Sequence, residues 1–148
     1  MSAKLNLLLI CQDHRACPHF VNHLEREGCH AILACDTEDA ARVLLGGGVA
    51  DVVLIHHQTI AGASIISSAL KVICPLMPMI LITVEWPKNG VLPEGVDAVC
   101  CANSLGRRAA RDIVRFVRYL LAEQPNQRLD NPRYDDGRFV PQKPNYLN

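Results

Sequence analysis

The chain has 148 residues, which suits one compact domain with a tail, because domains of about 100–150 residues bury a self-sufficient core. Hydrophobic residues make up 49% and charged residues 20%, which excludes an intrinsically disordered chain. No apolar run approaches the roughly 20 residues that span a bilayer, and the N-terminus lacks a signal-peptide pattern. We therefore expect a cytoplasmic protein without a membrane contact.

Charge and cysteine content narrow the function classes further. The formal net charge is +0, but residues 1–104 hold 6 basic and 10 acidic side chains, whereas residues 105–148 hold 9 basic and 5 acidic. This asymmetry bears on interaction surfaces and not on the fold. The seven cysteines contain no CxxC pair, so no zinc knuckle or thioredoxin motif is indicated. We expect most of them to be buried thiols in a reducing compartment.

In chain order, short apolar runs typical of strands buried on both faces alternate with segments of helical periodicity. The predicted strands are Lys4–Cys11, Ala31–Cys35, Asp51–Ile55, Met79–Val84 and Ala98–Cys101. The predicted helices run from Pro18 to Gly28, from Asp36 or Thr37 to Gly46, over Ile65–Val72 and over Leu105–Ala122. Between Thr83 and Gly95 the prolines and glycine allow only a loop or a single helical turn.

This alternation with short connections predicts a parallel sheet with helices on both faces. For five strands we expect the flavodoxin-like α/β fold, a doubly wound sheet of order 2-1-3-4-5. Its fourth helix would be shortened or missing. We assign residues 1–123 to this domain and residues 124–148, which are rich in Pro, Asn and Arg, to an extended tail.

Four segments, LLICQD, DVVLIHH, MILITV and GVDAVCCAN, carry a resemblance to a known family. Over residues 5–122 the chain resembles the CheY-like receiver domains of two-component response regulators. In that family the first strand ends in two adjacent acids that hold Mg²⁺, and the third strand ends in the phospho-accepting Asp. The fourth strand ends in Thr or Ser and the fifth in Lys-Pro.

The chain departs from the family at most of these positions. Gln12 and Asp13 stand where the acid pair belongs, and His56 occupies the position of the phospho-accepting Asp. Thr83 matches the switch hydroxyl, whereas Ala102 replaces the lysine. One carboxylate is a poor site for a cation that prefers several oxygen ligands, and histidine forms no acyl phosphate. The sequence therefore predicts a degenerate phosphorylation pocket without most of the groups that stabilise phosphoryl transfer.

The resemblance implies a pseudo-receiver that works in signal transduction by phosphorylation-independent protein–protein interaction, and not an enzyme. No cofactor is expected. Four arginines recur along one face of the last helix, where the family dimerises and meets its output. With Trp86, which lies in the weakened fourth-helix region, they form the predicted interaction surface: Arg108, Arg111, Arg115 and Arg118. We expect a protein partner and a homodimer, because one stripe on a neutral chain does not favour nucleic acid.

Two alternatives remain open at this point. The same fold can host a metal- or thiol-dependent sensor or small enzyme. Its candidate metal ligands are Asp13, His14 and His56, and its candidate redox thiols are Cys11, Cys100 and Cys101. The other alternative is a working phosphorelay receiver, which would need a phosphoacceptor other than an Asp at position 56.

Overall fold

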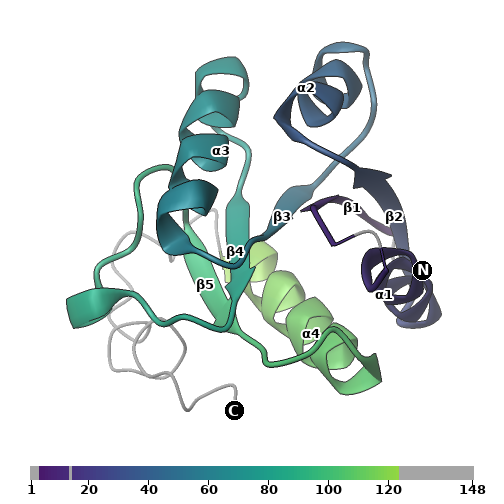
Figure 1. Cartoon of the computed structure of the whole chain (residues 1–148). Coiled ribbons are helices and arrows are strands. Elements are labelled where there is room, and N and C mark those ends of the chain that lie inside the picture. The colour runs from purple at the N-terminus through teal and green to yellow at the C-terminus, as the bar shows by residue number, and fades with distance from the viewer. Residues whose placement is uncertain (1–3, 14, 124–148) are drawn as a thin grey trace.

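The computed structural model describes residues 4–13 and 15–123, so His14 and the predicted tail at 124–148 lie outside the described residues. Figure 1 shows the arrangement of the elements. In chain order these are β1 (Leu5–Cys11), α1 (Cys17–Arg26), β2 (Cys29–Ala34), α2 (Thr37–Leu45), β3 (Val52–His56), α3 (Ile60–Ile73), β4 (Met79–Thr83), the 3₁₀ turn η1 (Lys88–Gly90), β5 (Ala98–Cys101) and α4 (Arg107–Glu123). None of the helices in this described part is long and apolar enough to cross a membrane.

The strands form one five-stranded parallel sheet of order β2-β1-β3-β4-β5, as predicted. Helices α1 and α4 cover one face of the sheet, and α2 and α3 cover the other (Figure 1). The strand order reverses between β1 and β3. In open parallel sheets, the carboxyl ends of the strands at such a point are where ligands bind.

The core lies in two layers, one on each face of the sheet. Alternate residues of β1 enter different layers: Leu7 and Leu9 pack toward α1 and α4, and Leu8 and Ile10 pack toward α2 and α3. All four side chains are fully buried. This explains why the strand is a continuous apolar run and not an alternating one.

Side-chain caps set where two of the helices begin. The Asp36 carboxylate accepts a hydrogen bond from the Asp39 backbone N–H at 2.8 Å, which confirms Asp36 as the cap of α2. Thr59 caps α3 in the same way, because its hydroxyl accepts from the Gly62 N–H at 3.1 Å. Helix α3 therefore begins five residues before the predicted Ile65.

The connection between β4 and β5 contains only η1, as the prolines predicted. Asn89 and Gly90 have φ values of 59° and 68°, which a continuing helix does not allow. Trp86 and Leu92 pack from this connection against the core layer of α2 and α3. Within the described residues, no α-helix lies between β4 and β5 to cover the outer face of α3.

Candidate functional site

The predicted pocket residues meet at the carboxyl edge of the sheet. His56 ends β3 and Thr83 ends β4, while Gln12 and Asp13 follow β1 and Ala102 follows β5. The strand register pairs Cys11 with His56 and Thr83 with Cys101. The fold therefore brings all five predicted positions to one edge.

Asp13 serves the backbone at this edge. Its Oδ1 atom accepts hydrogen bonds from the N–H groups of Arg15, at 2.9 Å, and Ala16, at 3.2 Å. The hydrogen bonds from Ala16 and Arg15 hold the pKa of the Asp13 carboxyl below its ordinary value. The carboxylate thus stabilises the turn that leads into α1.

Thr83 and Ala102 lie side by side at the ends of β4 and β5. The Thr83 side chain is buried, and its hydroxyl accepts a hydrogen bond from the Glu85 N–H at 3.1 Å. The Ala102 N–H donates to the Thr83 carbonyl at 3.0 Å. Glu85 in turn accepts from the Ile60 N–H at 3.1 Å, so these contacts join β4 to the start of α3.

These residues do not fit the Mg²⁺ ion that the receiver fold implies. Magnesium requires octahedral oxygen coordination and is usually held through carboxylates. Gln12 supplies a neutral amide at most, and position 56 supplies an imidazole. Of the five predicted pocket residues, Asp13 alone offers a carboxylate, and its Oδ1 already accepts two backbone hydrogen bonds. These residues therefore do not supply the Mg²⁺ ligands on which phosphoryl transfer in receivers depends.

His56 instead contacts Cys11 and lies near Cys17. Its Nδ1 atom lies 3.5 Å from Cys11 Sγ, and Cys11 is paired with Cys17 in a disulfide. Burial lowers the pKa of the His56 imidazole, against an opposing effect of Asp13. Within the described residues, the histidine thus shares its metal-ligand cluster with Cys11 and Cys17 and not with Asp13. The sequence interpretation missed Cys17, although a C-x₅-C spacing beside a strand-end histidine was visible.

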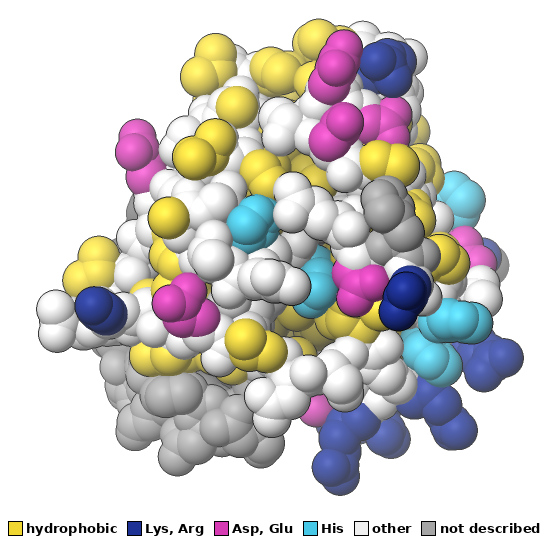
Figure 2. Space-filling view, in the orientation of Figure 1, with side chains coloured by type: hydrophobic (Ala, Val, Ile, Leu, Met, Phe, Trp, Pro, Cys, Tyr) yellow, Lys and Arg dark blue, Asp and Glu magenta, His cyan; other side chains and the backbone are white. Residues whose placement is uncertain are grey.

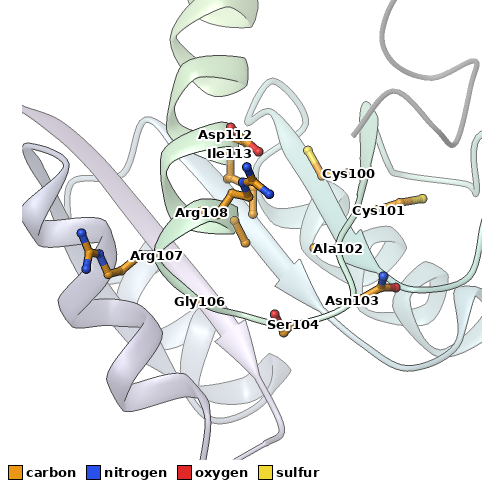
Figure 3. Close-up of a pocket in the computed structure, with 11 residues that line it drawn as sticks. Cys100, Cys101, Ala102, Asn103, Ser104, Gly106, Arg107, Arg108, Asp112 and Ile113 are labelled. Atoms are coloured by element: carbon orange, nitrogen blue, oxygen red, sulfur yellow. The ribbon is translucent and has the colours of Figure 1, made fainter. Parts of the chain in front are cut away.

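The expectation that most of the seven cysteines are buried thiols is wrong, because two of them form the disulfide and two others are not fully buried. Cys29, Cys100 and Cys101 are free and buried, Cys74 is half-buried and Cys35 is exposed. The Cys100 and Cys101 side chains enter opposite core layers. Figure 3 shows them leaving β5 in different directions, so the vicinal pair is badly placed to bridge itself, as predicted. Burial raises the pKa of the Cys101 thiol to about 11 and also raises that of Cys100.

A surface pocket of about 270 Å³ lies between the end of β5 and the first turns of α4. In Figure 3 the Arg108 side chain lies beside Asp112 and Ile113, whereas Arg107 points away from them toward a neighbouring helix. The remaining lining comes from Cys100 to Ser104, Gly106 and Ala109. An arginine beside an acid and a helix start gives this pocket mixed polarity and no catalytic arrangement.

The predicted arginine stripe is present on α4, where Arg108, Arg111, Arg115 and Arg118 are all exposed. Figure 2 shows Lys and Arg side chains gathered over α4 and the adjoining end of α1. Arg118 also donates to the Glu27 carbonyl at 3.5 Å, which joins α4 to the end of α1. Trp86 is half-buried against the core, so its indole is only partly available to a partner.

Helix α3 carries a second surface, which the sequence interpretation missed. Its exposed positions follow a spacing of four, four and three and are all apolar: Ala61, Ile65, Ala69 and Val72. Ile65 is 73% exposed and Val72 82%, and Leu76 beyond the helix is 91% exposed. Figure 2 shows hydrophobic side chains on the outer surface over α3. We call Ala61, Ile65, Ala69, Val72 and Leu76 the α3 stripe. Exposed apolar side chains gathered on one helix face are typical of surfaces that contact another molecule.

No protein-family model matches the chain, and no curated protein matches its sequence. Solved structures do match. A CheY-like receiver domain protein from Methanospirillum hungatei JF-1 aligns with a TM-score of 0.65 at 19% identity, over 82% of this chain and 97% of that one. The receiver domain of the Francisella response regulator 1452 gives 0.66 at 14%, over 81% and 98%. A two-component response regulator from Clostridium difficile gives 0.62 at 16%, over 83% and 99%.

The protein therefore has the flavodoxin-like fold of response-regulator receiver domains. The resemblance predicted from the sequence is confirmed at the level of fold, including the strand order.

Proposed function

We propose that this protein is a pseudo-receiver in signal transduction, which binds proteins without being phosphorylated by the receiver mechanism. The observation that carries the proposal is the side chain at position 56. A half-buried imidazole in contact with Cys11 Sγ at 3.5 Å stands where receivers carry the acyl-forming carboxylate. Asp13, the one carboxylate among the five predicted pocket residues, is hydrogen-bonded to the turn before α1.

The α3 stripe is the better self-association surface. A twofold dimer places the same patch of both copies face to face. The arginines of α4 would then repel each other, because like charges across an interface are costly. An uncharged apolar stripe has no such penalty and buries hydrophobic area on both copies. We therefore assign the homodimer contact to α3.

The α4 surface suits an acidic protein partner. Arg108, Arg111 and Arg115 are exposed and lie at spacings of three and four, on one face of the helix. Arg118 is partly committed to the Glu27 carbonyl. Complementary charge speeds encounter and selects partners more than it adds raw affinity. Partner binding at α4 should therefore weaken as salt is raised.

The test is the intact mass of the full chain after incubation with acetyl phosphate and Mg²⁺. The matched control is a triple variant that restores the family residues, Gln12→Asp, His56→Asp and Ala102→Lys, with Thr83 unchanged. We expect a phosphoryl adduct on the restored variant and none on the wild type. An adduct on the wild type that hydroxylamine removes would overturn the proposal.

A further inference from the structure

Cys11, Cys17 and His56 form a compact cluster that protein binding at α3 and α4 does not use. Cys11 ends β1, Cys17 opens α1 and His56 ends β3. One ligand atom from each residue lies within 4.8 Å of the other two. Both cysteines are buried, with exposed fractions of 2% and 1%, and His56 is half-buried at the surface side of the cluster.

The turn between β1 and α1 brings the two sulfurs together. The Cys17 N–H donates to the Asp13 carbonyl at 3.1 Å, while the Asp13 side chain accepts from Arg15 and Ala16. These bonds return the chain within six residues, so that the Cα atoms of Cys11 and Cys17 lie 6.3 Å apart. Backbone geometry therefore fixes the pair beside the imidazole of the adjacent strand.

We propose that Cys11, Cys17 and His56 bind one Zn²⁺ ion once the Cys11–Cys17 disulfide is reduced, and that the disulfide and the metal-bound state exclude each other. Thiolate and imidazole are the ligands that zinc prefers. Zn–S bonds of about 2.3 Å and Zn–N bonds of about 2.0–2.1 Å place tetrahedral sulfur and nitrogen ligands about 3.5 Å apart. Cys11 Sγ and His56 Nδ1 already lie at 3.5 Å.

The charge balance suits this buried position. Two thiolates neutralise a divalent ion, and a neutral imidazole adds no charge, so the cluster would carry no net charge where burial makes charge costly. Three protein ligands leave the fourth position of a tetrahedral ion open for water or another ligand. The hard, oxygen-preferring Mg²⁺ is excluded by the same donor set.

The two states are connected by thiol chemistry that balances. Two equivalents of a thiol reduce the Cys11–Cys17 disulfide, so that its S–S bond breaks and a new disulfide forms between the two reductant molecules. Each cysteine then carries one proton. Binding of Zn²⁺ releases these two protons and forms two Zn–S bonds. An oxidant such as a peroxide would take two electrons from the thiolates, reform the disulfide and expel the ion.

The experiment uses the full chain, stripped of metal and reduced with a trialkylphosphine, and titrates it with Co²⁺ as a coloured substitute for Zn²⁺. We expect one Co²⁺ per chain, a thiolate-to-cobalt charge-transfer band and displacement of Co²⁺ by Zn²⁺. Cys17→Ser and His56→Gln should each weaken Co²⁺ binding by more than about tenfold. Mutation of a residue that only hydrogen-bonds to a metal ligand already costs about tenfold in affinity, and these two residues are ligands themselves. The oxidised wild type should bind none.

Matched controls separate this cluster from other thiols and imidazoles. Cys35→Ser removes an exposed thiol, and His57→Gln removes an imidazole whose Nδ1 accepts from the Thr59 N–H; both should bind as the wild type does. No uptake by the reduced wild type would overturn the proposal. Equal uptake by the Cys17→Ser or the His56→Gln variant would overturn it too. The oxidised wild type carries no substitution. Its expected failure to bind Co²⁺ therefore cannot result from a folding defect that a substitution causes.

Discussion

Replacing Ile65 by Ser should raise the dissociation constant of the homodimer and have little effect on the stability of the folded monomer. The side chain is 73% exposed, and full burial of an isoleucine stabilises by about 1.5–3 kcal/mol. Covering the exposed part is therefore worth about 1–2 kcal/mol per copy. Both copies lose it in a symmetric dimer, a total of about 2–4 kcal/mol, or roughly 30-fold to 700-fold in the dissociation constant.

Sedimentation equilibrium over a range of concentrations measures that constant. Val91→Ser is the matched control, because Val91 is 67% exposed but lies after η1 and outside the α3 stripe. We expect Val91→Ser to dimerise like the wild type and Ile65→Ser to shift to monomer. Equal dissociation constants for the Ile65→Ser variant and the wild type would refute the assignment of the dimer contact to α3.

Three further predictions test the domain that presents these surfaces. Asp97→Ala should lower the free energy of unfolding, measured by urea denaturation, by about 1–3 kcal/mol. The reason is that Asp97 Oδ2 accepts hydrogen bonds from the buried Met79 N–H and from Lys71 Nζ, both at 2.8 Å. An unchanged urea midpoint would contradict this prediction. Gly95→Ala should destabilise the fold more than Gly47→Ala does. Both glycines have positive φ values, +83° and +87°, but a Cβ at Gly95 would lie within 2.9 Å of Ser67 atoms, whereas a Cβ at Gly47 would meet open space. Equal thermal midpoints for the two variants would contradict this packing argument. At pH 8, iodoacetamide should label the exposed Cys35 quickly and leave Cys100 and Cys101 nearly unlabelled. Burial raises the pKa of both of these thiols, that of Cys101 to about 11, so little reactive thiolate forms at pH 8. Comparable labelling of all three cysteines would show that β5 is accessible to the reagent.

Much of the fold could be predicted because each apolar run determines a local structure. The run over Leu7 to Ile10 is buried on both sides, and only a parallel sheet with two helical layers provides that burial. That no α-helix lies between β4 and β5 was also predictable, since Pro87, Gly90 and Pro93 cannot continue a helix. The start of α3 was mispredicted because a single hydroxyl, that of Thr59, decides it. The spacing of apolar residues gives no information about such a capping hydrogen bond.

The site was harder to predict because it depends on how two segments meet. The place of His56 among the degenerate receiver positions was predictable, because the apolar run before it shows where strand β3 ends. That Cys17 would fold back onto Cys11 depends on the Asp13 turn, whose hydrogen bonds no pattern of hydrophobic residues encodes. The α3 stripe could have been found, because its helix contains one charged residue, Lys71, in fourteen.

The measurement that tests the central claim most directly is native mass spectrometry of the full chain, with and without acetyl phosphate and Mg²⁺. It reads the oligomer mass and any covalent phosphoryl group together. The account predicts a dimer of unmodified chains in both samples, because neither the α3 contact nor His56 responds to the phosphodonor. A phosphoryl adduct on the chain, or a monomer in either sample, would contradict it.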